Sequence, residues 1–222
     1  MLSNFFRFDI LFEFWPQIAS GMWVTVKLAL AVVVMGIFVG LLIALIRIAG
    51  MKVVNLFILI FSDIFRTLPP LVVVIILYFG MPLADISISG FASVWIALAV
   101  KLAAFAQEIF YSSLLSVNRG QMDAAEASGL TFWQGIRYIL LPQAIRLSIP
   151  PITNRTIGTT KGTAIGSVVA VPDILAQAMD VQALVYNTTP LTMAAIGYMI
   201  IFFPLVVASR YLEKRYAVSN NK

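Results

Sequence analysis

Long continuous apolar runs restrict the fold of this 222-residue chain more than any other feature of its sequence. Residues 19–46 form the first run, and its main polar interruptions, Thr25 and Lys27, lie near its start. A run of this length exceeds the roughly 20 residues that an α-helix needs to cross a lipid bilayer. Apolar residues make up 61% of the chain and charged residues 11%, a composition typical of membrane proteins. We therefore predict an all-α polytopic membrane protein.

Four further apolar stretches follow the first run, which brings the predicted number of transmembrane helices to five. They cover residues 53–79, 91–117, 149–171 and 191–209. The second span contains Pro69 and Pro70, and a proline pair removes two backbone donors and disfavours helix in the residue before it. We expect this span to break there. The fourth span is rich in polar side chains, so protein or water must surround it.

The ends of the chain differ in composition from the predicted five-helix domain of residues 19–210. Residues 1–18 mix aromatic with charged side chains, which predicts an N-terminal segment on the headgroup boundary, ended by Pro16. Residues 211–222 form a basic tail. The one long hydrophilic interruption of the domain is the segment 118–151.

The distribution of basic residues predicts the orientation of the chain. Five spans place the two termini on opposite sides of the membrane, and Arg7 is the basic residue of the N-terminal side. The opposite side would carry Arg47, Lys52, Arg119, Arg137, Arg146, Arg210, Lys214, Arg215 and Lys222. By the positive-inside rule, the C-terminus and the segment 118–151 are cytoplasmic. This bias accounts for the net charge of +5 without a nucleic-acid partner.

The residue types that are absent exclude several kinds of chemistry. The chain has no cysteine and no histidine, so thiolate and imidazole metal sites are not expected, and we predict no cofactor. The P-loop pattern of ATPases is also absent from the sequence, and residues 158–163 have the wrong spacing for it. An intramembrane enzyme would need a nucleophile and a base that the sequence does not suggest. We therefore predict a transport subunit that is not itself an enzyme.

The segment 118–151 has the pattern of a helix–turn–helix. Residues 120–128 favour helix, Gly129 permits the positive φ of a turn, and apolar residues then recur at helical spacing. Because its alanines are small, the first helix forms a narrow projection that could fit closely into a groove of another protein. The alternative interpretation is a solvated loop with no partner.

The segment resembles the EAA loop of ABC importer permeases, whose pattern is Glu-Ala-Ala, three residues, Gly, nine residues and Ile-x-Leu-Pro. The matching positions are Asp123, Ala124, Ala125, Gly129, Ile139, Leu141 and Pro142. Residues 65–69, 141–154 and 171–175 are similar to the polar amino acid permeases, a group that includes the histidine and glutamine systems.

This resemblance implies the ABC type I importer permease architecture and a place in the inner (plasma) membrane, surrounded by lipid. In that family, five-helix subunits pair as homodimers or heterodimers, and the EAA loop docks on an ABC ATPase subunit dimer. An extracytoplasmic solute-binding protein delivers a small polar solute, an amino acid or an opine-like compound.

The chain departs from the family pattern at two positions. Asp123 stands where the family usually has glutamate, which keeps the charge but shortens its reach. Gly162 stands where many members have the aspartate of Lys-Asp-Thr, which removes an acid from the fourth span.

Charged and amide residues within the spans are candidates for the solute pathway, because an intramembrane charge costs about 3 kcal/mol or more unless a partner or water stabilises it. The candidates are Arg66, Glu108, Asn154, Arg155 and Lys161. A zwitterionic amino acid needs a cation for its carboxylate and an acceptor for its ammonium, and these residues could supply both. For Glu108 a structural ion pair with Arg66 or another buried cation is the equal alternative.

A competing function is an ion-coupled secondary transporter or channel with Lys101 and Glu108 as its relay. The two residues are seven positions apart, which places them on one helical face about 10 Å apart. The odd number of spans and the lack of an internal repeat fit this alternative less well.

Overall fold

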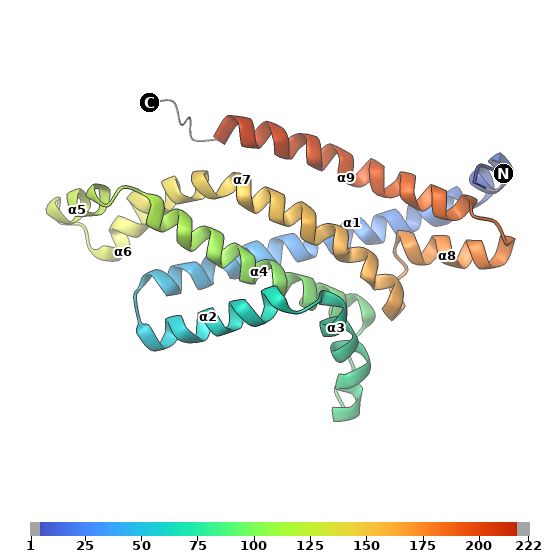
Figure 1. The fold of residues 1–222 in the computed structure, drawn as a ribbon, viewed down its shortest axis with the longest axis horizontal. Coiled ribbons are helices and arrows are strands. Elements are labelled where there is room, and N and C mark those ends of the chain that lie inside the picture. Colours follow the sequence, from blue (N-terminus) through green and yellow to red (C-terminus); the bar gives the residue numbers. More distant parts are fainter. Residues whose placement is uncertain (1–4, 217–222) are drawn as a thin grey trace.

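The computed structural model describes residues 5–216, and every regular element within them is helical (Figure 1). In chain order these elements are α1 (Phe8–Ile48), α2 (Lys52–Thr67), α3 (Pro70–Ile75), the π-turn η2 (Ile76–Gly80), the 3₁₀ turn η3 (Met81–Ala84), α4 (Gly90–Ser116), α5 (Gly120–Ala127), α6 (Phe132–Gly135), the π-turn η4 (Ile136–Leu140), α7 (Leu141–Thr160), the 3₁₀ helix η5 (Lys161–Val169), α8 (Ile174–Val185) and α9 (Thr189–Tyr216). The predicted all-α class is confirmed.

The described residues contain three single helices, α1, α4 and α9, that are long and apolar enough to cross a membrane. Two bent helix pairs raise that number to five when each pair counts as one span. One pair joins α2 to the helical turns of residues 70–84, and the other joins the helical run of residues 132–169 to α8. These five units correspond to the five predicted spans.

The most extensive helix contact lies between α1 and α4, which cross at the centre of the molecule (Figure 1). A Cβ atom at Gly40 would lie only 2.5 Å from the Cβ atom of Ala106, and one at Gly36 would lie 2.7 Å from that of Leu102. Small residues at such positions let two helix backbones approach closely, as membrane helices commonly do. We call this contact of α1 with α4 the seam. It joins the helix that carries Arg47 to the helix that carries Lys101 and Glu108.

The N-terminal helix is longer than predicted, because Pro16 lies inside α1 and does not end it. The expected helix end at Pro16 is wrong. Ile10 and Ile18, on either side of the proline, are both buried, and Ile18 packs with Ile174 and Met193 of α8 and α9. Packing against neighbouring helices holds the chain helical despite the missing N–H group. The interfacial position of residues 1–18 stays a prediction, and residues 1–4 lie outside the described residues.

The predicted break at Pro69 and Pro70 is confirmed, and the structure also gives the angle by which the second span bends there. Leu68 and Pro69 have extended backbone with ψ of 132° and 129°, and the two halves of the span meet at 98°. The helical turns from α3 to η3 consequently point away from the bundle at nearly a right angle (Figure 1).

The fourth span begins earlier than predicted. α6, η4, α7 and η5 follow one another without a loop from Phe132 to Val169, and Pro150 and Pro151 lie inside α7. Only the first part of the hydrophilic segment 118–151 is therefore a surface loop, and the remainder is the start of this long helix. The last helix also extends beyond its predicted end, so residues 211–216 of the predicted basic tail belong to α9. Residues 217–222 of that tail lie outside the described residues.

Candidate coupling loop and intramembrane charge sites

The loop formed by α5 and α6 lies at one end of the molecule, opposite α8 (Figure 1). Gly129 has φ of +83°, which confirms the predicted turn. Its N–H group donates to the carbonyl of Glu126 at 2.9 Å, and that of Leu130 donates to the carbonyl of Ala125 at 3.1 Å. These bonds satisfy the last carbonyls of α5, as a glycine in the left-handed conformation commonly does at a helix end.

A capping box starts α6, and the sequence prediction did not include it. The N–H group of Thr131 donates to Oε1 of Gln134 at 2.8 Å, and the Thr131 side chain in turn accepts from the backbone of residue 134. The pattern Ser/Thr-x-x-Glu/Gln before a helix was the available signal, as Thr-Phe-Trp-Gln. The turn is therefore defined from both sides.

The two short helices pack closely on each other. A Cβ atom at Gly135 would lie 2.7 Å from Sδ of Met122, and Ala125 is only 5% exposed. Beneath the loop, Leu114 of α4, Ile136 of η4 and Ala144 of α7 form a buried apolar cluster. This packing makes the loop a fixed extension of the helix bundle.

The predicted coupling residues separate into an outer and an inner group. Asp123, Ala124 and Pro142 are exposed. Ala125 is buried, whereas Ile139 and Leu141 are half-buried against the apolar cluster below the loop. Of the two alanines, only Ala124 is therefore available to a partner.

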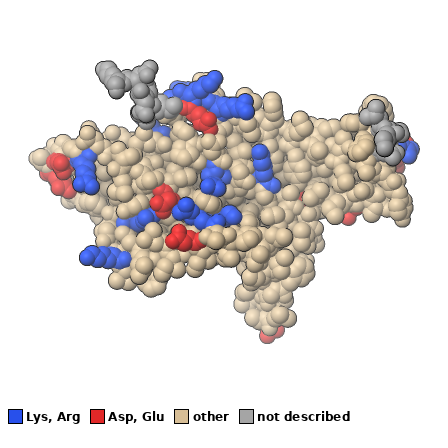
Figure 2. All heavy atoms as spheres, in the orientation of Figure 1, with Lys and Arg blue, Asp and Glu red and all other residues tan. Residues whose placement is uncertain are grey.

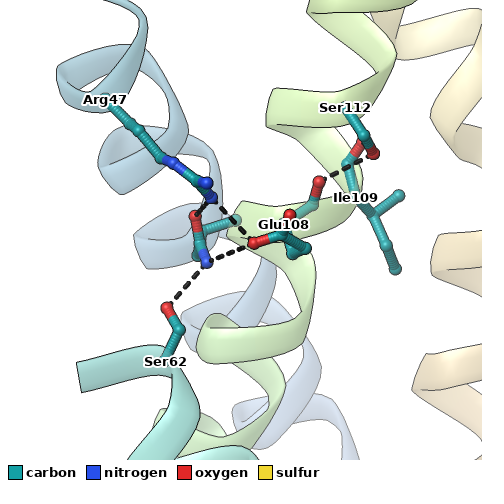
Figure 3. A network of polar contacts seen from close by, with 6 residues as sticks. Arg47, Ser62, Glu108, Ile109 and Ser112 are labelled. Atoms are coloured by element: carbon teal, nitrogen blue, oxygen red, sulfur yellow. Dashed lines mark hydrogen bonds and ion pairs between the residues drawn. The ribbon is translucent and has the colours of Figure 1, made fainter. Parts of the chain in front are cut away.

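Glu108 forms an ion pair with Arg47, whose Nη1 atom lies 2.7 Å from Oε2 of Glu108. The same guanidinium donates to Oε1 of Gln107 at 3.1 Å, and Gln107 donates to Oγ of Ser62 at 2.6 Å (Figure 3). The Arg47 guanidinium also stacks on the ring of Tyr111 at 3.9 Å. The network joins α1, α2 and α4.

This network bears on the two interpretations of Glu108. The acid pairs with a buried cation, as the structural alternative held, and that cation is Arg47 rather than Arg66. A place for Glu108 on the solute pathway stays a prediction. Sequence reasoning placed Arg47 in the short turn after the first span, whereas its side chain is only 10% exposed and turns back into the bundle. No signal in the local sequence indicated this, because the partners are 61 residues apart.

Arg66 and Arg155 come together on the ring of Phe105 of α4. The guanidinium of Arg155 lies 3.5 Å from the ring centroid and that of Arg66 lies 5.2 Å from it. Lys101, one turn earlier on α4, donates to the carbonyl of Leu68 at 3.3 Å, at the break of the second span. Lys101 and Glu108 thus have separate partners.

Asn154 and Lys161 lie elsewhere, between α7 and α9. Both line a pocket of about 420 Å³ with Ser209 and Glu213, and Ser209 donates to Oδ1 of Asn154 at 3.5 Å. Lys161 also lines an apolar pocket of about 450 Å³. The five predicted pathway residues are therefore distributed over three places.

Gly162 is half-buried in η5 and lies against Leu98 of α4. A Cβ atom there would lie 3.3 Å from Cδ2 of Leu98, so a longer side chain would require Leu98 to move. The packing at this position accordingly suits a small residue.

Comparison with known proteins places the chain in a family. Residues 13–218 match the family described as binding-protein-dependent transport system inner membrane component. The chain belongs to this family. The permease is 34% identical over 211 residues to the probable glutamine ABC transporter permease protein GlnM of Bacillus subtilis, which covers 93% of this chain and 96% of that protein. It is 30% identical to the glutamine transport system permease protein GlnP of Escherichia coli K12, with 90% and 93% covered.

A third relative is the L-cystine transport system permease protein TcyB of Bacillus subtilis, which is 30% identical over 91% of the permease and 88% of that protein. The fold matches the crystal structure of an amino acid ABC transporter with histidines, with a TM-score of 0.85, 29% identity, and 95% and 99% of the two chains covered. An inward-facing structure of the MetNI methionine ABC transporter matches in fold, with a TM-score of 0.73, 20% identity, and 91% and 97% covered. The predicted importer permease fold is confirmed, and the ion-coupled alternative is not favoured.

Proposed function

We propose that this permease carries a polar amino acid or a related small solute such as an opine, driven by ATP hydrolysis on a separate ATPase subunit dimer. Relatives that span nearly the whole chain are glutamine and L-cystine permeases, and these names support the solute class. An extracytoplasmic solute-binding protein delivers the solute, and a second permease subunit completes the path between the subunits.

The observation that carries the coupling proposal is the shape of the α5–α6 loop. Asp123 and Ala124 are exposed on a loop that its own turn bonds, capping box and buried cluster hold in place. A rigid loop can transmit the closure of an ATPase to α7, because the helical run from residue 132 to 169 has no loop in it. Alternating access then follows from rigid movement of helices around a fixed path.

The proposed orientation places the α5–α6 loop and the C-terminus in the cytoplasm. The basic residues Arg119, Arg137 and Arg146 lie on or just after this loop. The opposite end of the bundle carries α8, with Asp180 and the capping residue Asp173, and this end suits the extracytoplasmic side under the positive-inside rule.

Ala124→Arg tests the coupling proposal. The new side chain would fill the space that a partner groove needs, without disturbing the packing inside the loop. We expect the permease to insert in the membrane normally but to lose co-purification of the ATPase and ATP-dependent uptake in proteoliposomes. Ala183→Arg, at an exposed position on α8 at the other end of the molecule, is the matched control and should retain the ATPase.

Ala125→Arg is the weaker test, since a buried arginine would also disrupt the contact of α5 with α6. Unchanged ATPase retention and uptake in Ala124→Arg would contradict the coupling role. Uptake by the permease alone in liposomes, without any ATPase, would instead favour the ion-coupled class.

A further inference from the structure

Three cations gather in the middle of the permease around the ring of Phe105. Arg155 of α7 and Arg66 of α2 lie against this ring, and Lys101 precedes it by one turn on α4. Lys101 and Arg155 are close enough to repel each other electrostatically, and so are Arg155 and Arg66. Figure 2 shows basic side chains across the middle of one face, with acidic side chains among them. We call Arg66, Lys101 and Arg155 the cation cluster.

Among residues 5–216, no carboxylate oxygen lies within 4 Å of a side-chain nitrogen of the cation cluster; the acid nearest along the chain is Asp63, exposed on α2 three residues before Arg66. The ion pairs within this part of the chain join Arg7 to Asp9 and Arg47 to Glu108. Glu108, the acid nearest along α4, is already occupied by Arg47 and Gln107. Of the three cations, Lys101 is the one that donates to the carbonyl of Leu68.

A cluster of like charges that forms no ion pair is unfavourable within a membrane. Each intramembrane charge costs about 3 kcal/mol or more, and repulsion between like charges adds to that cost. Stacking on Phe105 offsets part of it for the two guanidinium groups. A bound anion would offset far more, and a guanidinium holds a carboxylate through two parallel hydrogen bonds.

We propose, on the basis of the transport function proposed above, that the cation cluster is a solute site selective for anions, and that the solute is an acidic amino acid or a related dicarboxylate. Arg155 and Arg66 bind the carboxylates, and Phe105 holds both guanidinium planes in place. Lys101 contributes a third positive charge one helical turn away. Glu108 is not part of this site, because its charge is neutralised by Arg47.

The test is direct solute binding to the permease–ATPase complex in lipid nanodiscs, with radiolabelled L-glutamate, L-glutamine and L-arginine as probes. L-Glutamine has nearly the size of L-glutamate but lacks its second negative charge, so the pair isolates charge from shape. We expect L-glutamate to bind at least about tenfold more tightly than L-glutamine, the effect of one additional charge-assisted contact. L-Arginine should bind more weakly than either.

Arg155→Gln and Arg66→Gln should each reduce the preference for L-glutamate over L-glutamine by about tenfold. Lys52→Gln, on an exposed residue at the start of α2, removes a cation outside the cluster and should leave the preference unchanged. Retention of the ATPase by each variant shows that its fold is intact.

Equal or tighter binding of L-glutamine, a preference for L-arginine, or no binding of any probe would overturn the proposed anion site. Such results would leave the coupling proposal standing, because retention of the ATPase and its loss in Ala124→Arg do not depend on the solute. Conversely, a permease that binds L-glutamate but never retains an ATPase would contradict the coupling proposal alone.

Discussion

Arg47 and Glu108 connect the end of α1 to α4 through an ion pair of 2.7 Å between Nη1 and Oε2. The pair lies close to the seam where Gly36 and Gly40 of α1 face Leu102 and Ala106 of α4. Gln107 and Ser62 extend it to α2 (Figure 3). One polar network thus ties together three helices, two of which also carry the cation cluster.

Arg47→Met should destabilise the permease by about 3 kcal/mol, the lower end of the range for breaking a buried pair, since Glu108 retains 37% exposure. The loss arises because the carboxylate of Glu108 and the amide of Gln107 lose their shared donor. Unfolding in detergent, followed by circular dichroism, measures the change. The double variant Arg47→Met/Glu108→Gln should recover part of the stability, because it no longer leaves a charge unpaired.

Asp9→Asn provides the control for that experiment, as it breaks the exposed Arg7–Asp9 pair and should leave unfolding unchanged. Equal stability of Arg47→Met and the unmodified permease would contradict a structural role for the buried pair.

Gly40→Leu should disrupt the packing of α1 on α4. Even a Cβ atom at this position lies 2.5 Å from that of Ala106, and overpacking a tight contact costs roughly 1–3 kcal/mol or more. Gly158→Ala is the matched control, because within the described residues no other side chain and no other helix lies within 4 Å of a Cβ atom at this position of α7. That change should be neutral or should stabilise the helix by up to about 1 kcal/mol. Thermal unfolding of the two variants in the same detergent compares them, and equal melting temperatures would argue against the close seam.

Gly129→Val should destabilise the turn between α5 and α6. The backbone at this position has φ of +83°, where a side chain costs roughly 1–2 kcal/mol and a β-branched one is especially unfavourable. Hydrogen exchange of the α5 amide groups should become faster, and retention of the ATPase should fall. Gly129→Asn should retain both properties better, since asparagine tolerates the left-handed conformation. The prediction is contradicted when valine and asparagine variants exchange alike.

Much of the fold could be predicted from sequence because the governing signals are local. The length of each apolar run predicted its span, Pro69 and Pro70 predicted the break, and Gly129 predicted the turn before α6. The spacing of the EAA pattern indicated the correct family. A local rule also failed at Pro16, where contacts of Ile18 with α8 and α9 keep α1 helical through the proline.

The charged sites depended on the tertiary structure. Sequence established that Arg66, Glu108, Asn154, Arg155 and Lys161 lie within spans, but not which of them meet. Only the packing of the helices paired Glu108 with Arg47, placed Arg66 and Arg155 on one aromatic ring and left Asn154 and Lys161 beside α9. Helix, turn and span signals act over a few residues along the chain, whereas the partner of an intramembrane charge comes from another helix whose register and rotation are set by packing.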